Sequence, residues 1–174
     1  MRKLICIALF IAATSMVAKA QETPAADVSA GYSYFRLGGS GGTNQNGVSG
    51  SLAYNVNNWL GAVGDFGGYH SSPSGVSLTT YTYMFGPRLS YRTESTVTPF
   101  AQALFGGSHL TASAFGTSGS GNAFAFSFGG GADFRLTDNL AFRPQFDYVG
   151  LHSNGSTENC ARISAAIVFR FGQK

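Results

Sequence analysis

Charged residues are scarce in this chain. They make up 11% of its 174 residues, whereas soluble proteins have about 25%. This low charge argues against an ordinary cytosolic protein. A disordered chain is excluded as well, because disorder requires low hydrophobicity together with high charge, and 44% of the residues are hydrophobic.

Long apolar runs are also absent. The run from Leu4 to Val17 is shorter than the roughly 20 residues that a transmembrane helix needs. Two basic residues precede this run, and the small-residue motif Ala18-Lys19-Ala20 follows it. This order is typical of a Sec-type signal peptide. We therefore expect residues 1–20 to be removed on export, and a retained N-terminal anchor helix is the alternative.

The excess of positive charge disappears with the signal peptide. The net charge of the whole chain is +3. Arg2, Lys3 and Lys19 leave on cleavage, so the 11 basic residues become 8, which equals the 8 acidic residues. A neutral mature chain lacks the basic surface that binds nucleic acid, and we expect no nucleic-acid partner.

Cysteine is nearly absent. Cys6 lies in the signal peptide, so Cys160 is the single cysteine of the mature chain. An intramolecular disulfide is therefore excluded, although an exported protein could form one. The residue directly after the cleavage site is Gln21 rather than cysteine, which disfavours a lipoprotein. We interpret Cys160 as a small strand residue rather than as a nucleophile or a metal ligand.

Glycine and aromatic residues are abundant, with 24 glycines and 14% aromatic side chains. Large residues alternate with small or polar ones. The clearest example is Asn122 to Leu136, where Phe124, Phe126 and Phe128 fall on one face of a strand and small or polar residues fall on the other. Similar runs occur at 28–34, 48–56, 59–70, 81–91, 97–107, 140–150 and 161–171.

The length and the faces of these runs predict a membrane barrel. A strand of about ten residues, tilted by about 40°, spans about 25 Å, which is the height of the apolar band of an outer-membrane barrel. An eight-stranded barrel is only just wide enough inside for side chains, so the aromatic rows must face outward. We predict an all-β fold in which an eight-stranded antiparallel up-and-down transmembrane β-barrel (27–174) follows a signal peptide (1–20) and a short periplasmic tail (21–26).

The connections between the runs alternate in length. Short connections at 57–58, 93–96 and 137–139 alternate with longer Gly/Ser-rich segments at 38–46, 70–77, 108–121 and 152–158. Outer-membrane barrels have short periplasmic turns and longer external loops. The sequence therefore predicts both termini in the periplasm and four long external loops.

The inward faces of the predicted strands carry charged residues. Because buried charges must be paired, we interpret them as a network that fills the lumen, with a gate or a selective pore lining as the alternative. Between Val97 and Gly107 the assignment of faces depends on Gln102, which forces Phe100 and Leu104 inward. The predicted network consists of Asp65, Arg88, Asp133, Arg135, Arg143, Asp147, Arg162 and Arg170.

Five short motifs occur in order along the chain: Ser29-Ala30-Gly31-Tyr32-Ser33-Tyr34, Gly86-Pro87-Arg88, Pro99-Phe100, Gly129-Gly130-Gly131-Ala132-Asp133 and Ile167-Val168-Phe169-Arg170-Phe171. This set resembles the OmpA/OmpX-like outer-membrane β-barrel family, for the barrel domain only. The resemblance implies an outer-membrane location, contact with lipid, a lumen plugged by polar networks, and insertion by the barrel assembly machinery. That machinery reads a terminal aromatic residue in the family, and here Phe171 is followed by three more residues.

The three histidines and one short motif raise the question of chemistry. His70, His109 and His152 fall near the loop ends of strands that are not neighbours, so we expect no metal or cofactor site. Some eight-stranded barrels are lipid A deacylases, and His152-Ser153-Asn154 is similar to the His-x-Ser-Asn pattern of that family. Here the histidine and the serine are adjacent, and adjacent strand residues face opposite sides. A local turn that brings Ser156 or Glu158 to His152 would be the one route to a catalytic group.

These patterns together predict a protein that is not an enzyme and that resides in the outer membrane. We expect the barrel to hold its external loops for envelope stability or for binding a surface ligand. The alternatives are a lipid-modifying enzyme at the outer leaflet and a narrow channel.

Overall fold

The computed structural model describes residues 24–38, 42–93, 95–114 and 117–173. The predicted signal peptide (1–20) and residues 21–23 lie outside the described residues. The strands are β1 (Pro24–Arg36), β2 (Asn44–Asn55), β3 (Leu60–Ser71), β4 (Ser77–Ser90), β5 (Val97–Ala114), β6 (Thr117–Arg135), β7 (Leu140–Ser153) and β8 (Ser156–Gln173). A 3-10 turn, η1 (Pro73–Gly75), lies between β3 and β4. None of the helical segments in the described ranges has the length and the apolar character that crossing a membrane requires.

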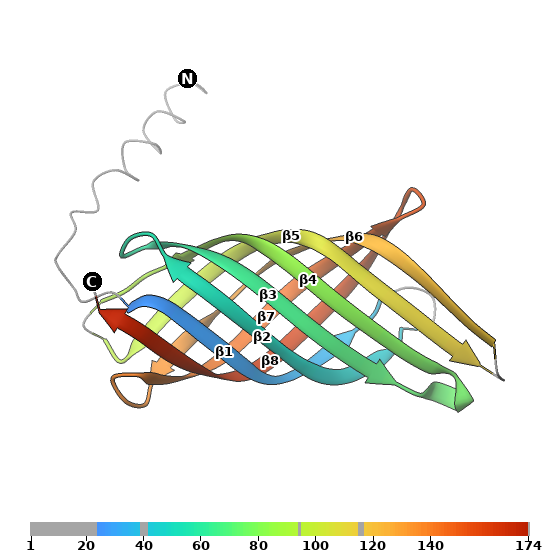
Figure 1. Cartoon of the computed structure of the whole chain (residues 1–174), viewed down its shortest axis with the longest axis horizontal. Helices are drawn as coiled ribbons and strands as arrows, with labels where there is room; N and C mark the ends of the chain where they lie inside the picture. Colours follow the sequence, from blue (N-terminus) through green and yellow to red (C-terminus); the bar gives the residue numbers. More distant parts are fainter. Residues whose placement is uncertain (1–23, 39–41, 94, 115–116, 174) are drawn as a thin grey trace, which may run out of the picture.

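The eight strands form one closed barrel. Each strand pairs with the next in the chain, and β8 pairs with β1 in antiparallel fashion, as Figure 1 shows. Pro24 pairs with Gln173, so β1 begins and β8 ends at the same end of the barrel, which we call the turn end. Residues 56–59, 91–93, 95–96 and 136–139 also lie there, and the opposite end is called the loop end. The predicted eight-stranded up-and-down barrel is confirmed.

The barrel begins earlier than the sequence predicted. The tail was expected to reach Ala26, but β1 begins at Pro24. Pro24 and Ala26 pair with Gln173 and Phe171 of β8. An unpaired strand edge is unfavourable, so Pro24 and Ala26 extend β1 alongside the end of β8. The prediction that residues 24–26 form a tail is wrong.

Two of the predicted long loops are mostly strand. β5 continues to Ala114 and β6 begins at Thr117, so residues 108–114 and 117–121 are paired strand residues. In segment 152–158 the connection is Asn154-Gly155, with φ angles of 50° and 78°. Asn-Gly is the favoured sequence of a two-residue hairpin turn because both residues tolerate positive φ. The prediction of long loops is wrong here, since Ser, Thr and Gly residues continue the ladder to the tip.

The outward face is apolar and aromatic, and the inward face is small or polar. In β4, Tyr81 and Phe85 are 55% and 54% exposed, whereas Thr82 and Met84 between them are 3% and 0% exposed. In β5 the residues between Val97 and Gly107 have the predicted faces, because Phe100, Gln102 and Leu104 are all buried. The outward side chains form the surface that meets the lipid.

Outward aromatic rings also cover glycines of the neighbouring strand. A Cβ added to Gly150 would overlap the ring of Phe126, whereas a Cβ added to Gly119 would meet nothing within 4 Å. The Phe126 ring therefore packs directly over the backbone of Gly150. This contact is possible because glycine has no side chain.

Gly150→Ala is expected to destabilise the barrel by about 1 kcal/mol, because the Phe126 ring must move off its site. Gly119→Ala is the matched control and should have no such effect. The free energy of unfolding in urea, measured in lipid bilayers, checks both. In a Phe126→Leu background the cost of Gly150→Ala should shrink, and an unchanged cost would contradict the contact.

Candidate functional site

The lumen is filled by side chains of two kinds. Arginines, aspartates and amides form a polar network. An apolar cluster, which we call the apolar plug, includes residues near the loop-end tips of β1, β3 and β7. The plug consists of Phe35, Leu37, Ala53, Val63, Tyr69, Met84, Leu104, Ala125, Val149, Leu151 and Cys160.

The middle cluster joins three strands around Arg162. This arginine of β8 is fully buried. Its Nη1 donates to Asp65 Oδ1 at 2.6 Å, and its Nε donates to Asp147 Oδ2 at 2.9 Å. Nη1 also lies 3.3 Å from the hydroxyl oxygen of Tyr69. One guanidinium therefore holds the carboxylates of β3 and β7, with charge-assisted hydrogen bonds on two sides.

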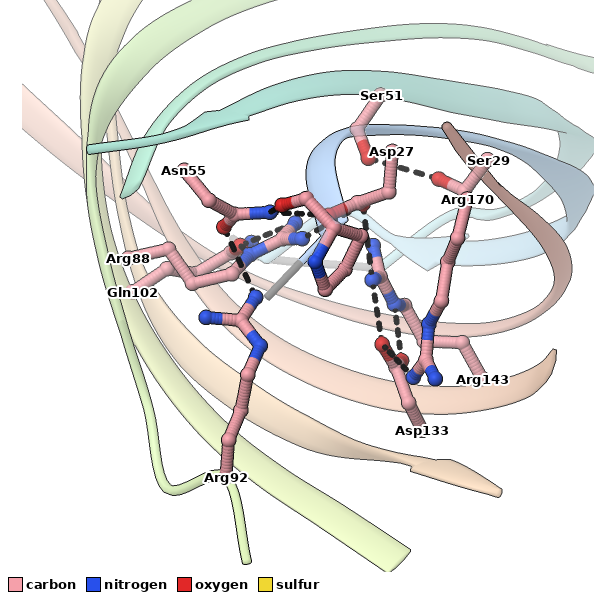
Figure 2. A network of polar contacts seen from close by, with 11 residues as sticks. Asp27, Ser29, Ser51, Asn55, Arg88, Arg92, Gln102, Asp133, Arg143 and Arg170 are labelled. Carbon is pink, nitrogen blue, oxygen red and sulfur yellow. Dashed lines mark hydrogen bonds and ion pairs between the residues drawn. The ribbon is translucent and has the colours of Figure 1, made fainter. Parts of the chain in front are cut away.

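The turn-end cluster contains Asp27, Arg88, Asp133, Arg143 and Arg170 (Figure 2). Asp27 Oδ1 accepts from Arg143 Nη2 at 3.1 Å and from Arg88 Nη1 at 3.4 Å. Asp133 accepts from Arg143 Nη2 at 2.8 Å and from Arg170 Nη2 at 3.3 Å. Each carboxylate is thus shared between two arginines.

Neutral side chains complete this network. The guanidinium carbons of Arg88 and Arg143 lie 4.6 and 4.9 Å from the centroid of the Phe100 ring, where the ring quadrupole attracts them. Gln102 accepts from Arg88 Nη2 at 3.0 Å and donates to Asp147 Oδ1 at 3.3 Å. Gln102 therefore links the turn-end cluster to the middle cluster, and the lumen contains one continuous polar network.

The structure places most of the predicted charged residues in this network. Asp65, Arg88, Asp133, Arg143, Asp147 and Arg162 are all buried. Arg170 is 15% exposed and pairs with Asp133. The prediction for Arg135 is wrong, because its side chain is exposed. Arg135 ends β6 at the turn end, and its side chain lies outside the buried part of the lumen.

Sequence reasoning missed Asp27 and Tyr69 among the members of the lumen. Asp27 is 3% exposed and binds two arginines, yet it was absent from the predicted set. The alternation of β1 places it on the inward face with Ser29, so the signal was present. Tyr69 is 1% exposed and stacks on Phe35 with ring centroids 4.6 Å apart. Its spacing of four residues from Asp65 puts both on one face.

The histidine, serine and glutamate of the deacylase hypothesis do not converge. His152 pairs across the hairpin with Thr157, and its Nδ1 lies 2.8 Å from the Thr157 hydroxyl oxygen. Ser153 pairs with Ser156, and Glu158 pairs with Leu151. Strand alternation puts these two pairs on the face opposite to His152. The Asn154-Gly155 turn therefore brings neither Ser156 nor Glu158 to the imidazole.

The histidines lie apart on the outward side of the loop end. Each contacts a hydroxyl or amide oxygen of the next strand: Thr79 for His70, Asn122 for His109 and Thr157 for His152, with distances of 3.0, 2.7 and 2.8 Å. Within the described part of the chain, no group of three or more His, Cys, Asp or Glu side chains could hold a metal ion.

Solved structures of small outer-membrane barrels are similar to this fold. Neisserial surface protein A superposes with a TM-score of 0.74 at 17% sequence identity, covering 84% of this chain and 97% of that protein. For Ail of Yersinia pestis the TM-score is 0.63 at 20% identity, with 84% and 97% coverage. For the N-terminal barrel of Pseudomonas aeruginosa OprF it is 0.60 at 16% identity, with 86% and 100% coverage. At these identities the similarity concerns the fold alone.

The sequence itself matches a family of such barrels. Residues 5–171 match the family described as outer membrane protein beta-barrel domain. No curated protein sequence is similar enough to this chain to count as a relative. Because the match spans nearly the whole chain, this protein belongs to the outer-membrane β-barrel domain family and lies in the outer membrane.

Proposed function

We propose that this barrel is a non-enzymatic surface protein that presents its loop end to partners outside the cell. The observation that carries the proposal is the contrast between a filled lumen and an exposed loop-end hairpin. β5 and β6 pair as far as Ala114 and Thr117, whereas the pairing of β6 with β7 begins only at Phe124. Residues 117–122 are exposed, so they are available for contact.

Similar proteins support a role at the surface. Ail is described as the attachment invasion locus protein of Yersinia pestis, and one of its structures contains the heparin analogue sucrose octasulfate. For this chain we propose a surface ligand of unspecified class. Lipid is the second partner, since the outward aromatic residues match the belt of an outer-membrane barrel. The barrel assembly machinery is the third, and Phe171 is the residue we expect it to read.

Shortening the hairpin tests the surface role. Leu110 pairs with Gly121, so replacing residues 111–120 by Asn-Gly should close a tight turn and leave the barrel intact. We expect cells that carry this variant to lose adhesion to host-cell matrix or to change their detergent sensitivity. Heat-modifiable gel mobility verifies folding. Unchanged adhesion and detergent sensitivity in a folded, surface-exposed variant would contradict the proposal.

The filled lumen should prevent steady ion flow. The polar network spans the turn-end and middle clusters, and the apolar plug contributes Phe35, Tyr69 and Leu151 toward the loop end. We expect planar-bilayer recordings to show no persistent large conductance, because eight strands leave no wide lumen. A stable open channel would favour the channel alternative instead.

The enzyme alternative predicts a change in lipid A. A deacylase needs its base within hydrogen-bond reach of a nucleophile, and His152 instead contacts Thr157. We expect the lipid A mass spectrum to be the same in cells without the protein, with it, and with His152→Ala. Loss of an acyl chain with the wild type but not with His152→Ala would overturn the non-enzymatic assignment.

A further inference from the structure

Charge is unevenly distributed along the lumen. The turn-end cluster contains three arginines and two aspartates, and the middle cluster contains one arginine and two aspartates. The network as a whole is neutral, with an excess of positive charge toward the turn end. Positive charge at a mouth with low-dielectric walls attracts anions.

One donor of the turn-end cluster has no acceptor among the described residues. Arg143 is 2% exposed, and its Nη1 is buried without a hydrogen-bond partner. Asp133 takes the Nε and Nη2 hydrogens of the same guanidinium, and Asp27 also binds Nη2. Nη1 is therefore the nitrogen that remains available. A buried charged group with an unsatisfied donor is costly, which favours an additional acceptor at this point.

Two arginines lie at the partly exposed edge of the cluster: Arg170, which belongs to it, and Arg92, which lies beside it. The side chain of Arg170 is 15% exposed. Arg92, in the connection between β4 and β5, is only partly buried and donates to Asn55 Oδ1 at 2.9 Å and to Asn58 O at 3.0 Å. Burial lowers the pKa of Arg92, the Asp27 carboxylate opposes that shift, and Arg170 adds to it. Asn55 in turn donates through Nδ2 to Asp27 Oδ2 at 3.5 Å, so one amide side chain links Arg92 to the turn-end cluster (Figure 2).

We propose that the turn-end cluster binds a small oxyanion, of the chemistry of inorganic phosphate, through Arg143 Nη1 together with Arg170 and Arg92. Arginine guanidinium groups match the geometry of phosphate oxygens. Asp27 and Asp133 bind the Nε and Nη2 nitrogens of Arg143, so the anion approaches the guanidinium group from its Nη1 side. The phosphate could be free in the periplasm or belong to a lipid headgroup, and the two sources are separable.

Calorimetric titration of the folded mature chain with sodium phosphate tests the proposal. The barrel is held in phosphatidylcholine bilayers, and sodium chloride of equal ionic strength is the reference. We expect saturable binding of one phosphate per chain. Arg170→Gln and Arg92→Gln should each weaken it by about tenfold, because each removes a charge-assisted hydrogen bond. Arg135→Gln removes an exposed arginine at the same end and should leave it unchanged.

A second variant changes affinity in the opposite direction. Asp133→Asn removes a negative charge and one of the two acceptor oxygens that bind Arg143, so phosphate should bind more tightly to the folded variant. Phosphatidylglycerol bilayers distinguish free phosphate from a lipid headgroup as the source of the anion. If free phosphate no longer binds in these bilayers, the lipid headgroup occupies the site. The proposal is overturned if no saturable binding occurs in phosphatidylcholine, or if Arg135→Gln weakens it as much as Arg170→Gln does.

Discussion

Replacing Arg162 by methionine is expected to destabilise the barrel by about 3–5 kcal/mol, the usual cost of removing one partner of a buried ion pair. Arg162 is fully buried and pairs with Asp65 and Asp147. Methionine fills a similar volume without charge, so the variant leaves two buried carboxylates without their cation. Urea unfolding in bilayers, followed by tryptophan fluorescence and gel mobility, gives the free-energy difference.

The triple variant separates charge from packing. Adding Asp65→Asn and Asp147→Asn to Arg162→Met removes the stranded carboxylates as well. Replacing all members of a buried ionic group by neutral residues often costs little or even stabilises. We therefore expect the triple variant to recover most of the loss. Arg135→Met is the matched control, and it should be near neutral because Arg135 is exposed. A triple variant as unstable as the single one would show that packing, not charge, dominates.

The middle cluster also explains how the closed barrel is stabilised beyond its backbone ladder. Arg162 lies on β8, Asp65 lies 97 residues earlier on β3, and Asp147 lies on β7. Backbone pairing connects only neighbouring strands, whereas this arginine connects β8 to a strand that is not its neighbour. The network thus fixes the cross-section of the barrel, and this role agrees with a lumen that is filled rather than open.

Much of the fold was predictable because every strand lies between lipid and a narrow lumen. That environment forces large and small residues to alternate, and adjacent residues such as Phe126 and Ser127 then reveal both faces. Even the weak pattern around Gln102 gave the correct faces. Burial of the inward charges followed from the same alternation.

Other features depend on information that local patterns do not contain. Which arginine pairs with which aspartate is set by the tilt of the strands, and Arg162 and Asp65 are too far apart in sequence for spacing to connect them. The composition of 108–121 is common to loops and to exposed hairpins, so only the presence of a partner strand decides between them. The error at Arg135 has a similar origin, because alternation gives the face of a residue but not its height along the barrel.

The outward face gives the second large prediction. Phe126 lies in the central part of β6, on the outward face, and its ring covers Gly150. Phe126→Arg is expected to cost about 2–4 kcal/mol if this position lies at the bilayer midplane, because an arginine there faces hydrocarbon. Unfolding in bilayers of a single lipid measures the cost.

Two control variants test whether the cost of Phe126→Arg comes from placing a charge in the hydrocarbon of the bilayer. Phe126→Leu keeps the position apolar and loses the ring contacts with Gly150, Phe128 and Tyr148, so it should cost less than Phe126→Arg. Ser127→Ala changes the inward face, where the Ser127 hydroxyl is buried without a hydrogen-bond partner among the described residues, and it should be near neutral. Lipids with longer acyl chains should increase the cost of Phe126→Arg, since a thicker hydrocarbon layer leaves the guanidinium farther from water. If Phe126→Arg were no worse than Phe126→Leu, Phe126 would not face the hydrocarbon, and the assignment of the two faces along β6 would have to be reversed.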